Sequence, residues 1–201
     1  MHSTHTSSTN SLNGTDTTFV SSSNDYSNFQ VFAIRESENS KNIYFQLTSS
    51  RSPYPLPELT SSIFFHTYNN TNWNISVRLK PSNYPFSGIV SGAESYNYDV
   101  IFKGSNVEAG VVVNSFELTG SIPLTSGSNF IKYPKRVYAG ARRTNITGAL
   151  LQSSDVLLGN VKYWTKYLDD DSLLQHSNDI FNSGISGSYK NISPLQLSGT
   201  A

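Results

Sequence analysis

Side chains that could carry out hydrolytic chemistry are few and scattered. A retaining glycosidase needs two carboxyls about 5 Å apart and an inverting one about 6.5–9.5 Å apart, which a strand would present as a motif such as Glu-x-Asp-x-x-Glu. No such motif occurs, and the acids on apolar segments are isolated singles: Glu94, Asp99, Glu108 and Glu117. There is no Gly-x-Ser-x-Gly elbow, and neither His66 nor His176 lies in a motif. We therefore expect no catalytic residues and predict that the chain is not an enzyme.

Metal binding has one candidate segment. The chain contains no Cys, which excludes disulfides, Cys-based zinc sites and Cys nucleophiles. The three acids of Asp169–Asp171 could suggest calcium, which prefers clustered oxygen ligands. At the start of a helix they are better explained as a cap and as partners of the helix dipole. Asp99 and Asp155 are separate oxygen-ligand candidates. We expect no cofactor, with calcium as the open alternative and its ligands unknown.

Three polar groups have the chemistry of a glycan site, which needs an aromatic platform beside Asn, Asp or Arg. The first is Tyr68, Asn70 and Asn72 in the segment HTYNNTNW. The second is Tyr96, Tyr98 and Asp99, and the third is Arg142, Arg143 and Asn145. Aromatic residues of an all-β protein more often belong to the core, so a core role is the alternative for each tyrosine.

Composition indicates one all-β domain. The 201 residues are 36% hydrophobic and only 14% charged, with 12 Tyr and 11 Phe, which favours strands and turns over helices. A chain of this length can bury its own core. The formal net charge is zero, so we expect no nucleic-acid partner. No apolar stretch approaches the ~20 residues that span a bilayer, and the N-terminus does not read as a Sec signal peptide.

Short apolar segments recur about every ten residues between turn residues, a spacing typical of a β-sandwich. Trp73–Lys80 alternates cleanly, which predicts one face in a core and the face with Arg78 in water. The other expected strands are Phe29–Ile34, Ile43–Thr48, Ser62–His66, Asn97–Lys103, Val107–Val113, Phe116–Ile122, Asn129–Tyr133, Lys135–Arg142 and Ala149–Leu151.

The end of the chain combines an alternating run with a helix. Asp155–Leu168 alternates, with inward positions at Val156, Leu158, Val161 and Tyr163 and a switch of face near Gly159, where a bulge would fit. Asp169–Asp179 is predicted to be a helix with Asp169 as N-cap and the pair Leu173 and Leu174 as its buried stripe. The core is also expected to contain Trp164, Tyr167 and Leu168. We expect a flexible arm or linker at 1–25, one domain at 26–190 and a tail at 191–201.

The segment 137–184 carries a resemblance to a known family. Three of its motifs resemble the last strands and terminal helix of concanavalin A-like and laminin-G-like domains. They are Tyr138-Ala139-Gly140, Val161-Lys162-Tyr163-Trp164 and Leu168-Asp169-Asp170-Asp171-Ser172-Leu173. The more specific sequence looks like the lectin-like domains of structural proteins of tailed bacteriophages and related viruses. It comprises KRVYAGARRTNITG, VKYW and YLDDDSL, together with WNISVRLKPSNYP and YDVIFKG upstream. The resemblance covers roughly residues 40–185.

This resemblance implies a jelly roll of two antiparallel sheets and a lectin-like fold in which calcium is common. It implies a non-enzymatic structural or decoration domain of a virion, made in the host cytoplasm and located in the extracellular particle. The expected partners are other virion proteins, further copies of the chain and host-surface glycans, with no membrane insertion. The first alternative is a cellular carbohydrate-binding or adhesion module of the same fold, and the second, weaker one is a glycoside hydrolase.

Overall fold

The structure is a computed structural model, and it describes residues 2–5, 27–49, 56–83, 96–132, 135–143, 149–154, 157–179 and 181. Strands make up most of the described chain. In sequence order the elements are β1 (His2–His5), β2 (Ser27–Arg35), β3 (Ile43–Thr48), β4 (Leu59–Thr60), β5 (Trp73–Pro81), β6 (Asn97–Glu108), β7 (Val111–Pro123), α2 (Leu124–Lys132), β8 (Lys135–Tyr138), β9 (Ala141–Arg143), β10 (Leu150–Ser153) and α3 (Asp170–Asn178).

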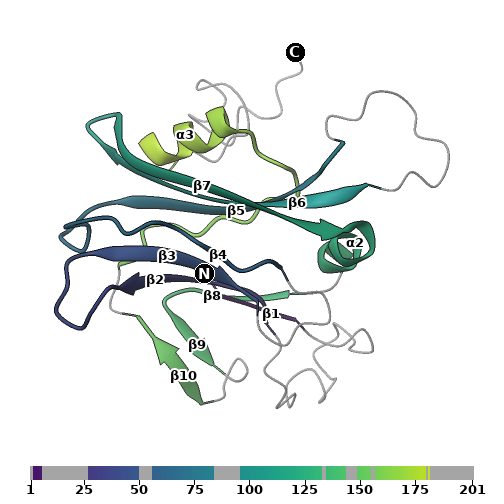
Figure 1. The fold of residues 1–201 in the computed structure, drawn as a ribbon, viewed down its shortest axis with the longest axis horizontal. Coiled ribbons are helices and arrows are strands. Elements are labelled where there is room, and N and C mark those ends of the chain that lie inside the picture. Colours follow the sequence, from purple (N-terminus) through teal and green to yellow (C-terminus); the bar gives the residue numbers. More distant parts are fainter. Residues whose placement is uncertain are drawn as a thin grey trace.

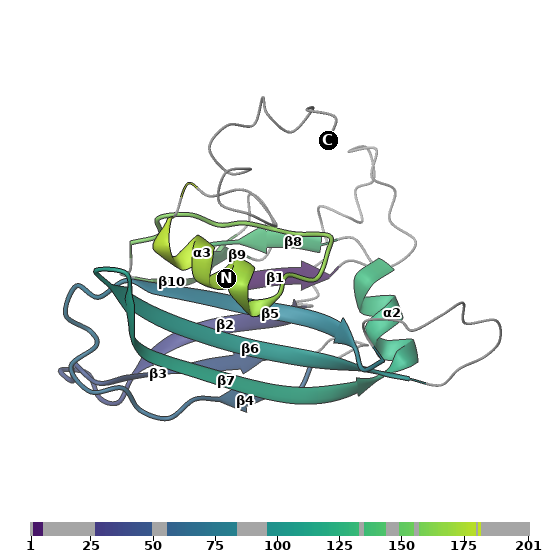
Figure 2. The ribbon, with the colours of Figure 1, turned by 90° about the horizontal axis from the view of Figure 1, so that it is seen from above.

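The strands form two main layers (Figure 1). One is a five-stranded sheet in the order β4-β3-β2-β1-β8, and the other is a three-stranded sheet in the order β5-β6-β7. Every pairing in both sheets is antiparallel, and β9 and β10 form a separate antiparallel pair. Helix α3 lies over the outer face of the three-stranded sheet, and α2 lies at one end of it (Figure 2). This mostly β, antiparallel and β-sandwich-like arrangement with a C-terminal helix confirms the coarse prediction.

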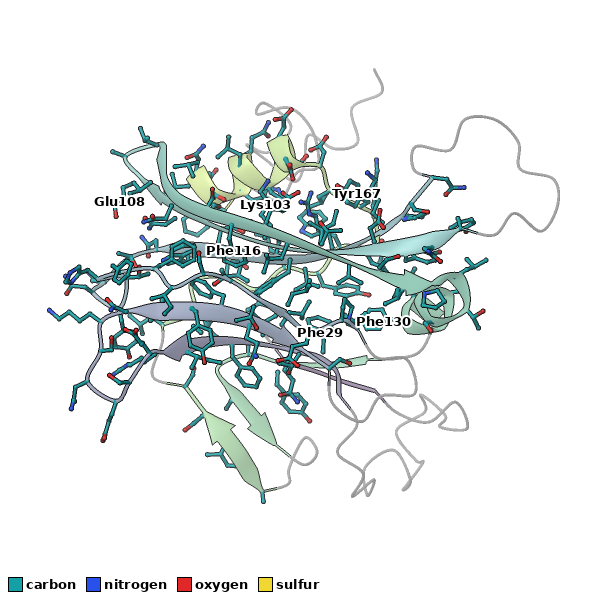
Figure 3. The ribbon with its side chains drawn as sticks, in the orientation of Figure 1. Phe29, Lys103, Glu108, Phe116, Phe130 and Tyr167 are labelled. Carbon is teal, nitrogen blue, oxygen red and sulfur yellow. The ribbon has the colours of Figure 1, made fainter. Side chains whose placement is uncertain are left out.

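A hydrophobic core fills the space between the two layers. Leu47 of β3 meets Val100 and Phe102 of β6, and all three side chains are fully buried. An aromatic group continues the core toward one end, where the ring centroids of Phe45 and Trp73 are 4.7 Å apart and Phe116 packs beside them (Figure 3). Burial of such side chains supplies most of the stabilisation of a sandwich, about 25 cal/mol per Å² of apolar surface.

Strand β5 has the predicted alternation, but its outer face is not in water. Ile75, Val77 and Leu79 pack against the core as expected. Arg78, on the opposite face, is only 7% exposed because α3 and the residues before it cover this part of the sheet. The prediction of a solvated outer face was therefore wrong at Arg78.

Helix α3 confirms the predicted helix and its cap. The carboxylate of Asp169 accepts a hydrogen bond of 2.8 Å from the Ser172 amide, which satisfies one of the free amides of the first turn. The buried stripe differs from the expected one, because Ser172 and His176 face the protein whereas Leu174 is exposed. Of the residues expected in the core, Leu168 is buried, but Trp164 is half-buried and stacks on His176 with ring centroids 5.4 Å apart.

Helix α2 replaces the strand that was expected at 129–133. Its residues have modest helix propensity, so tertiary packing decides the structure. Phe130 is buried with its ring 6.1 Å from that of Phe29 on β2. Gly127 lies against the ring of Tyr98, close enough that a Cβ atom there would be 2.6 Å from the ring's Cγ. The helix thereby closes one end of the core.

Two other expected strands are also different. The segment 107–113 is a hairpin turn rather than one strand, because Ala109 and Gly110 adopt φ values of 50° and 80° and join β6 to β7. The expected strand at 62–66 is reduced to a single bridge between Phe64 and Ile43.

The segment before α3 forms no strand in its described part, residues 157–168. Val161 and Tyr163, expected to point inward, are exposed. The segment runs along the β5 edge of the three-stranded sheet without joining it (Figure 2). Its partly buried positions are Lys162, Trp164 and Tyr167. At the other terminus, β1 lies between β2 and β8, so residues 2–5 of the expected arm belong to a sheet.

Candidate functional site

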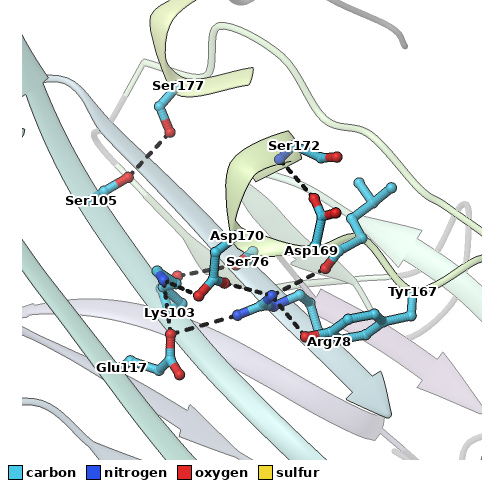
Figure 4. Close-up of polar contacts among 11 residues, drawn as sticks. Ser76, Arg78, Lys103, Ser105, Glu117, Tyr167, Asp169, Asp170, Ser172 and Ser177 are labelled. Carbon is cyan, nitrogen blue, oxygen red and sulfur yellow. Dashed lines mark hydrogen bonds and ion pairs between the residues drawn. The ribbon is translucent and has the colours of Figure 1, made fainter. Parts of the chain in front are cut away.

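Four charged side chains converge on the outer face of the three-stranded sheet, under the start of α3 (Figure 4). We call Arg78, Lys103, Glu117 and Asp170 the charged cluster. Asp170 Oδ1 lies 2.7 Å from Arg78 Nη1, and its Oδ2 lies 3.0 Å from Lys103 Nζ. Lys103 Nζ is also 2.8 Å from Glu117 Oε2, which is 3.7 Å from Arg78 Nη2. Each strand of the sheet and the helix therefore contributes one charge.

The strand register explains how residues so far apart in sequence meet. Lys103 on β6 is directly opposite Glu117 on β7, so both side chains point to the same face. Arg78 reaches the same face from β5 and also donates hydrogen bonds of 3.1 Å to the Tyr167 hydroxyl and to the carbonyl of Leu168. The Arg78 guanidinium is thus held from the outer side by the chain segment that covers the sheet, residues 167–170.

The electrostatics of the charged cluster favour the ionised forms. Burial alone would raise the pKa of the Asp170 carboxyl, but the hydrogen bond from Lys103 and the charge of Arg78 hold that pKa below its ordinary value. Burial alone would lower the pKa of Lys103, and hydrogen bonds to Glu117 and Asp170 raise it instead. The cluster has two positive and two negative charges, so it is neutral as a whole.

This geometry suits attachment of α3 better than acid–base chemistry. Glu117 and Asp170 share Lys103, so they are close enough to be compared with a carboxyl pair of a glycosidase. A general acid needs a raised pKa, whereas that of Asp170 is lowered. Sequence reasoning took Glu117 for an isolated acid and Arg78 for a solvated residue, so it contained no signal of this cluster.

The first expected glycan group places one aromatic side chain beside two exposed amides. Tyr68 is half-buried against the core, and the guanidinium of Arg35 lies over its ring at 3.7 Å from the centroid. Asn70 and Asn72 are exposed, and Asn70 has a φ of 61°. The amides are therefore open to a ligand, while one face of the ring is already covered.

The second expected group is divided between the two faces of β6. Tyr98 is buried in the core, whereas Asp99, the next residue of the strand, points to the opposite face. Tyr96 packs beside Tyr98, with ring centroids 5.7 Å apart. Tyr98 is therefore a core residue, and this corrects the expectation that it lies with Asp99 on one binding surface.

The expected groups do not form one site. The first directly precedes Trp73, which pairs with Asn106, whereas the second includes Tyr98, which pairs with Pro81. These pairs are at opposite ends of β5, roughly 27 Å apart at about 3.4 Å per residue.

The third group is only partly described. Arg142 and Arg143 belong to β9 and pair with Gln152 and Leu150 of β10, while Asn145 lies outside the described residues.

Metal and membrane sites have no support in the described part of the chain. Within it, no three His, Cys, Asp or Glu side chains gather as a metal ion would require. Asp169 instead caps α3 and Asp170 belongs to the charged cluster. Neither described helix has the length and apolar character needed to cross a membrane.

An exposed apolar strip lies along the segment beside β5. We define the apolar strip by four side chains with exposed fractions of 100%, 51%, 41% and 67%: Leu157, Leu158, Val161 and Tyr163. Single exposed apolar residues are common on protein surfaces, but several within one short segment are a candidate interaction surface. Sequence reasoning placed Leu158, Val161 and Tyr163 inside the sheet because their alternation is that of a strand.

The fold and its surface together define an antiparallel, β-sandwich-like domain with an outer helix fixed by ion pairs. No protein-family model matches the chain, and the searches of curated proteins and of solved structures find no match either.

Proposed function

We propose that this chain is a non-enzymatic structural or decoration domain of a virus particle, built on a concanavalin A-like jelly roll. Its role is to contact other proteins of the particle. The resemblance of 137–184 to lectin-like domains of phage structural proteins motivates the particle, and the β-sandwich-like layers are compatible with it.

The observation that carries the proposal is the apolar strip. Four apolar side chains in seven consecutive residues are at least 41% exposed, with Leu157 fully exposed. Burying them against a partner would contribute about 25 cal/mol per Å² of apolar surface removed from water. A partner protein is the simplest way to cover such a strip.

A non-enzymatic role is supported by the state of the charged cluster. It is the one place among the described residues where two carboxylates and two cations meet, and all four charges are engaged with one another. A hydrolase would need one carboxyl of such a pair to hold a proton near neutral pH.

The test is incorporation into particles. Particles made with the Leu157→Ser/Tyr163→Ser double variant should contain several-fold less of the protein than particles made with the unchanged chain. Thr165→Ser, at an exposed polar position of the same segment, is the matched control. Absence of the unchanged protein from purified particles, or equal incorporation of both variants, would contradict the proposal.

Glycan attachment is the second candidate, shared with a cellular adhesion module of the same fold. It rests on the exposed amides of Asn70 and Asn72 beside Tyr68. The purified protein should bind a defined subset of a glycan array, tested with calcium and then with a chelator. Asn72→Ala, which leaves the backbone carbonyl bonded to Asn106, should abolish that binding. A blank array under both conditions would remove this candidate.

A further inference from the structure

The outer edge of the three-stranded sheet is long, and no other described strand pairs with it. Strand β7 has 13 residues, nine of them exposed, and its only partner in the described part of the chain is β6. Alternate residues of an edge strand point their N–H and C=O groups outward, so about six residues of β7 offer an unpaired donor and acceptor. Such an edge is a template for another strand.

The opposite edge of the same sheet shows that this exposure is not general. Strand β5 has nine residues and none of them is exposed, and the segment 157–168 runs along its side of the sheet (Figure 2). In the five-stranded sheet, the edge strand β4 is only two residues long. Of these edges, β7 alone is long and has no described segment running along its backbone, while Pro57 and Leu59 pack against its inner face near Gly120.

Strand β7 has few of the features that keep edges apart, although a bulge at Val113 interrupts its register with β6. Its sequence VVVNSFELTGSIP contains no Lys or Arg, and its single Pro is the last residue. Three consecutive exposed valines, Val111–Val113, begin the strand. Its one charge, Glu117, is neutralised by Lys103 at 2.8 Å.

We propose that β7 pairs with β7 of a second copy of this chain, antiparallel and about a two-fold axis, to form a continuous six-stranded sheet. A second copy fits because an antiparallel edge is complementary to itself and because the net charge of the chain is zero, so two copies do not repel one another. This inference goes beyond the proposed function, since β7 carries it whatever the domain does.

The size of the contact places the dimer among the weak, transient interfaces. At about 3.4 Å per residue and a sheet thickness of about 10 Å, the edge presents roughly 440 Å² on each copy. The total of about 900 Å² is near the lower limit of specific interfaces. We therefore expect a reversible dimer with a Kd of the order of tens of micromolar.

Sedimentation velocity of the unchanged chain gives the first test. Between about 1 and about 500 µM, the mean mass should rise from 22.2 kDa toward twice that value. The absence of Cys allows the contact to be trapped by single introduced thiols. Ser115→Cys and Thr119→Cys are exposed positions on either side of the strand centre, and Thr165→Cys, beside the opposite edge, is the control.

Each thiol pair reports one register of the two strands. Ser115→Cys or Thr119→Cys alone traps a pairing centred on that residue, and a mixture of the two traps a pairing centred on Glu117. We expect one of these three samples to oxidise to a disulfide dimer at least tenfold faster than Thr165→Cys. A constant monomer mass over the whole range, or equal rates for all samples, would overturn the proposal. Neither result bears on the apolar strip, which has its own test above.

Discussion

The strongest test of how α3 is held is removal of the Asp170 carboxylate. In Asp170→Ala, the buried Arg78 guanidinium loses an oxygen at 2.7 Å and Lys103 loses one at 3.0 Å. A hydrogen bond to a charged group contributes about 1.5–3 kcal/mol. The Asp170 side chain is 56% exposed, which screens its ion pairs. Arg78 also keeps its hydrogen bond to the Leu168 carbonyl, so we expect the free energy of unfolding to fall by about 2 kcal/mol.

Asp171→Ala is the matched control. Asp171 is the next residue of the same first turn and is exposed, so both variants lose a favourable charge at the helix N-terminus, worth about 0.5 kcal/mol. The difference of about 1.5 kcal/mol isolates the ion pairs and corresponds to a Tm about 3–6 °C lower for Asp170→Ala.

Urea unfolding followed by tryptophan fluorescence measures this difference. Trp73 lies in the core and Trp164 stacks on His176 of α3, so the two residues report the sandwich and the helix. Equal midpoints for Asp170→Ala and Asp171→Ala would refute the conclusion that the charged cluster holds α3.

Three further predictions follow from the described contacts. The pKa of Asp170 is lower in the folded protein than its unfolded value of 3.8, so its contribution to the free energy of unfolding is present above about pH 4 and is lost as the pH falls through the folded pKa. In an acid titration, the stability of Asp170→Ala should therefore fall less steeply than that of the unchanged chain. Gly104→Ala puts a methyl group into core side chains and should cost about 1–3 kcal/mol in urea unfolding, whereas Gly159→Ala meets no atom within 4 Å and should change stability by less than about 0.5 kcal/mol. His176→Ala removes the ring stacked on Trp164 and should shift the fluorescence emission to longer wavelength; an unchanged spectrum would contradict that contact.

The elements that could be predicted are those whose signals are local. Asp169 with two further acids marks the start of α3, and the alternation from Trp73 marks β5 and its inner face. Both depend on residues a few positions apart, which set the cap and the direction of neighbouring side chains. These two predictions are confirmed.

The remaining features depend on contacts that sequence spacing does not contain. Arg78 looked like a solvated residue because the layer that covers it comes about ninety positions later, at Leu168 and Asp170. Helix α2 forms from hydroxyl, Asn and Gly residues because Phe130 and Gly127 fit against the core. The sequence around Tyr98 does not distinguish a core tyrosine from a ligand-binding one, and only the strand register shows that Tyr98 is buried.

The three-stranded sheet has a consequence for the order of folding. Its strands are consecutive in the chain, and the β6–β7 pairing begins between Glu108 and Val111, which are three residues apart. In the five-stranded sheet, β1 must find β8, where His2 pairs with Tyr138. Loop closure favours local pairings, so the β5–β7 meander should form in the folding transition state and the larger sheet should assemble on it afterwards. Substitutions at Val100 would then slow folding, whereas substitutions in β1 would mainly speed unfolding.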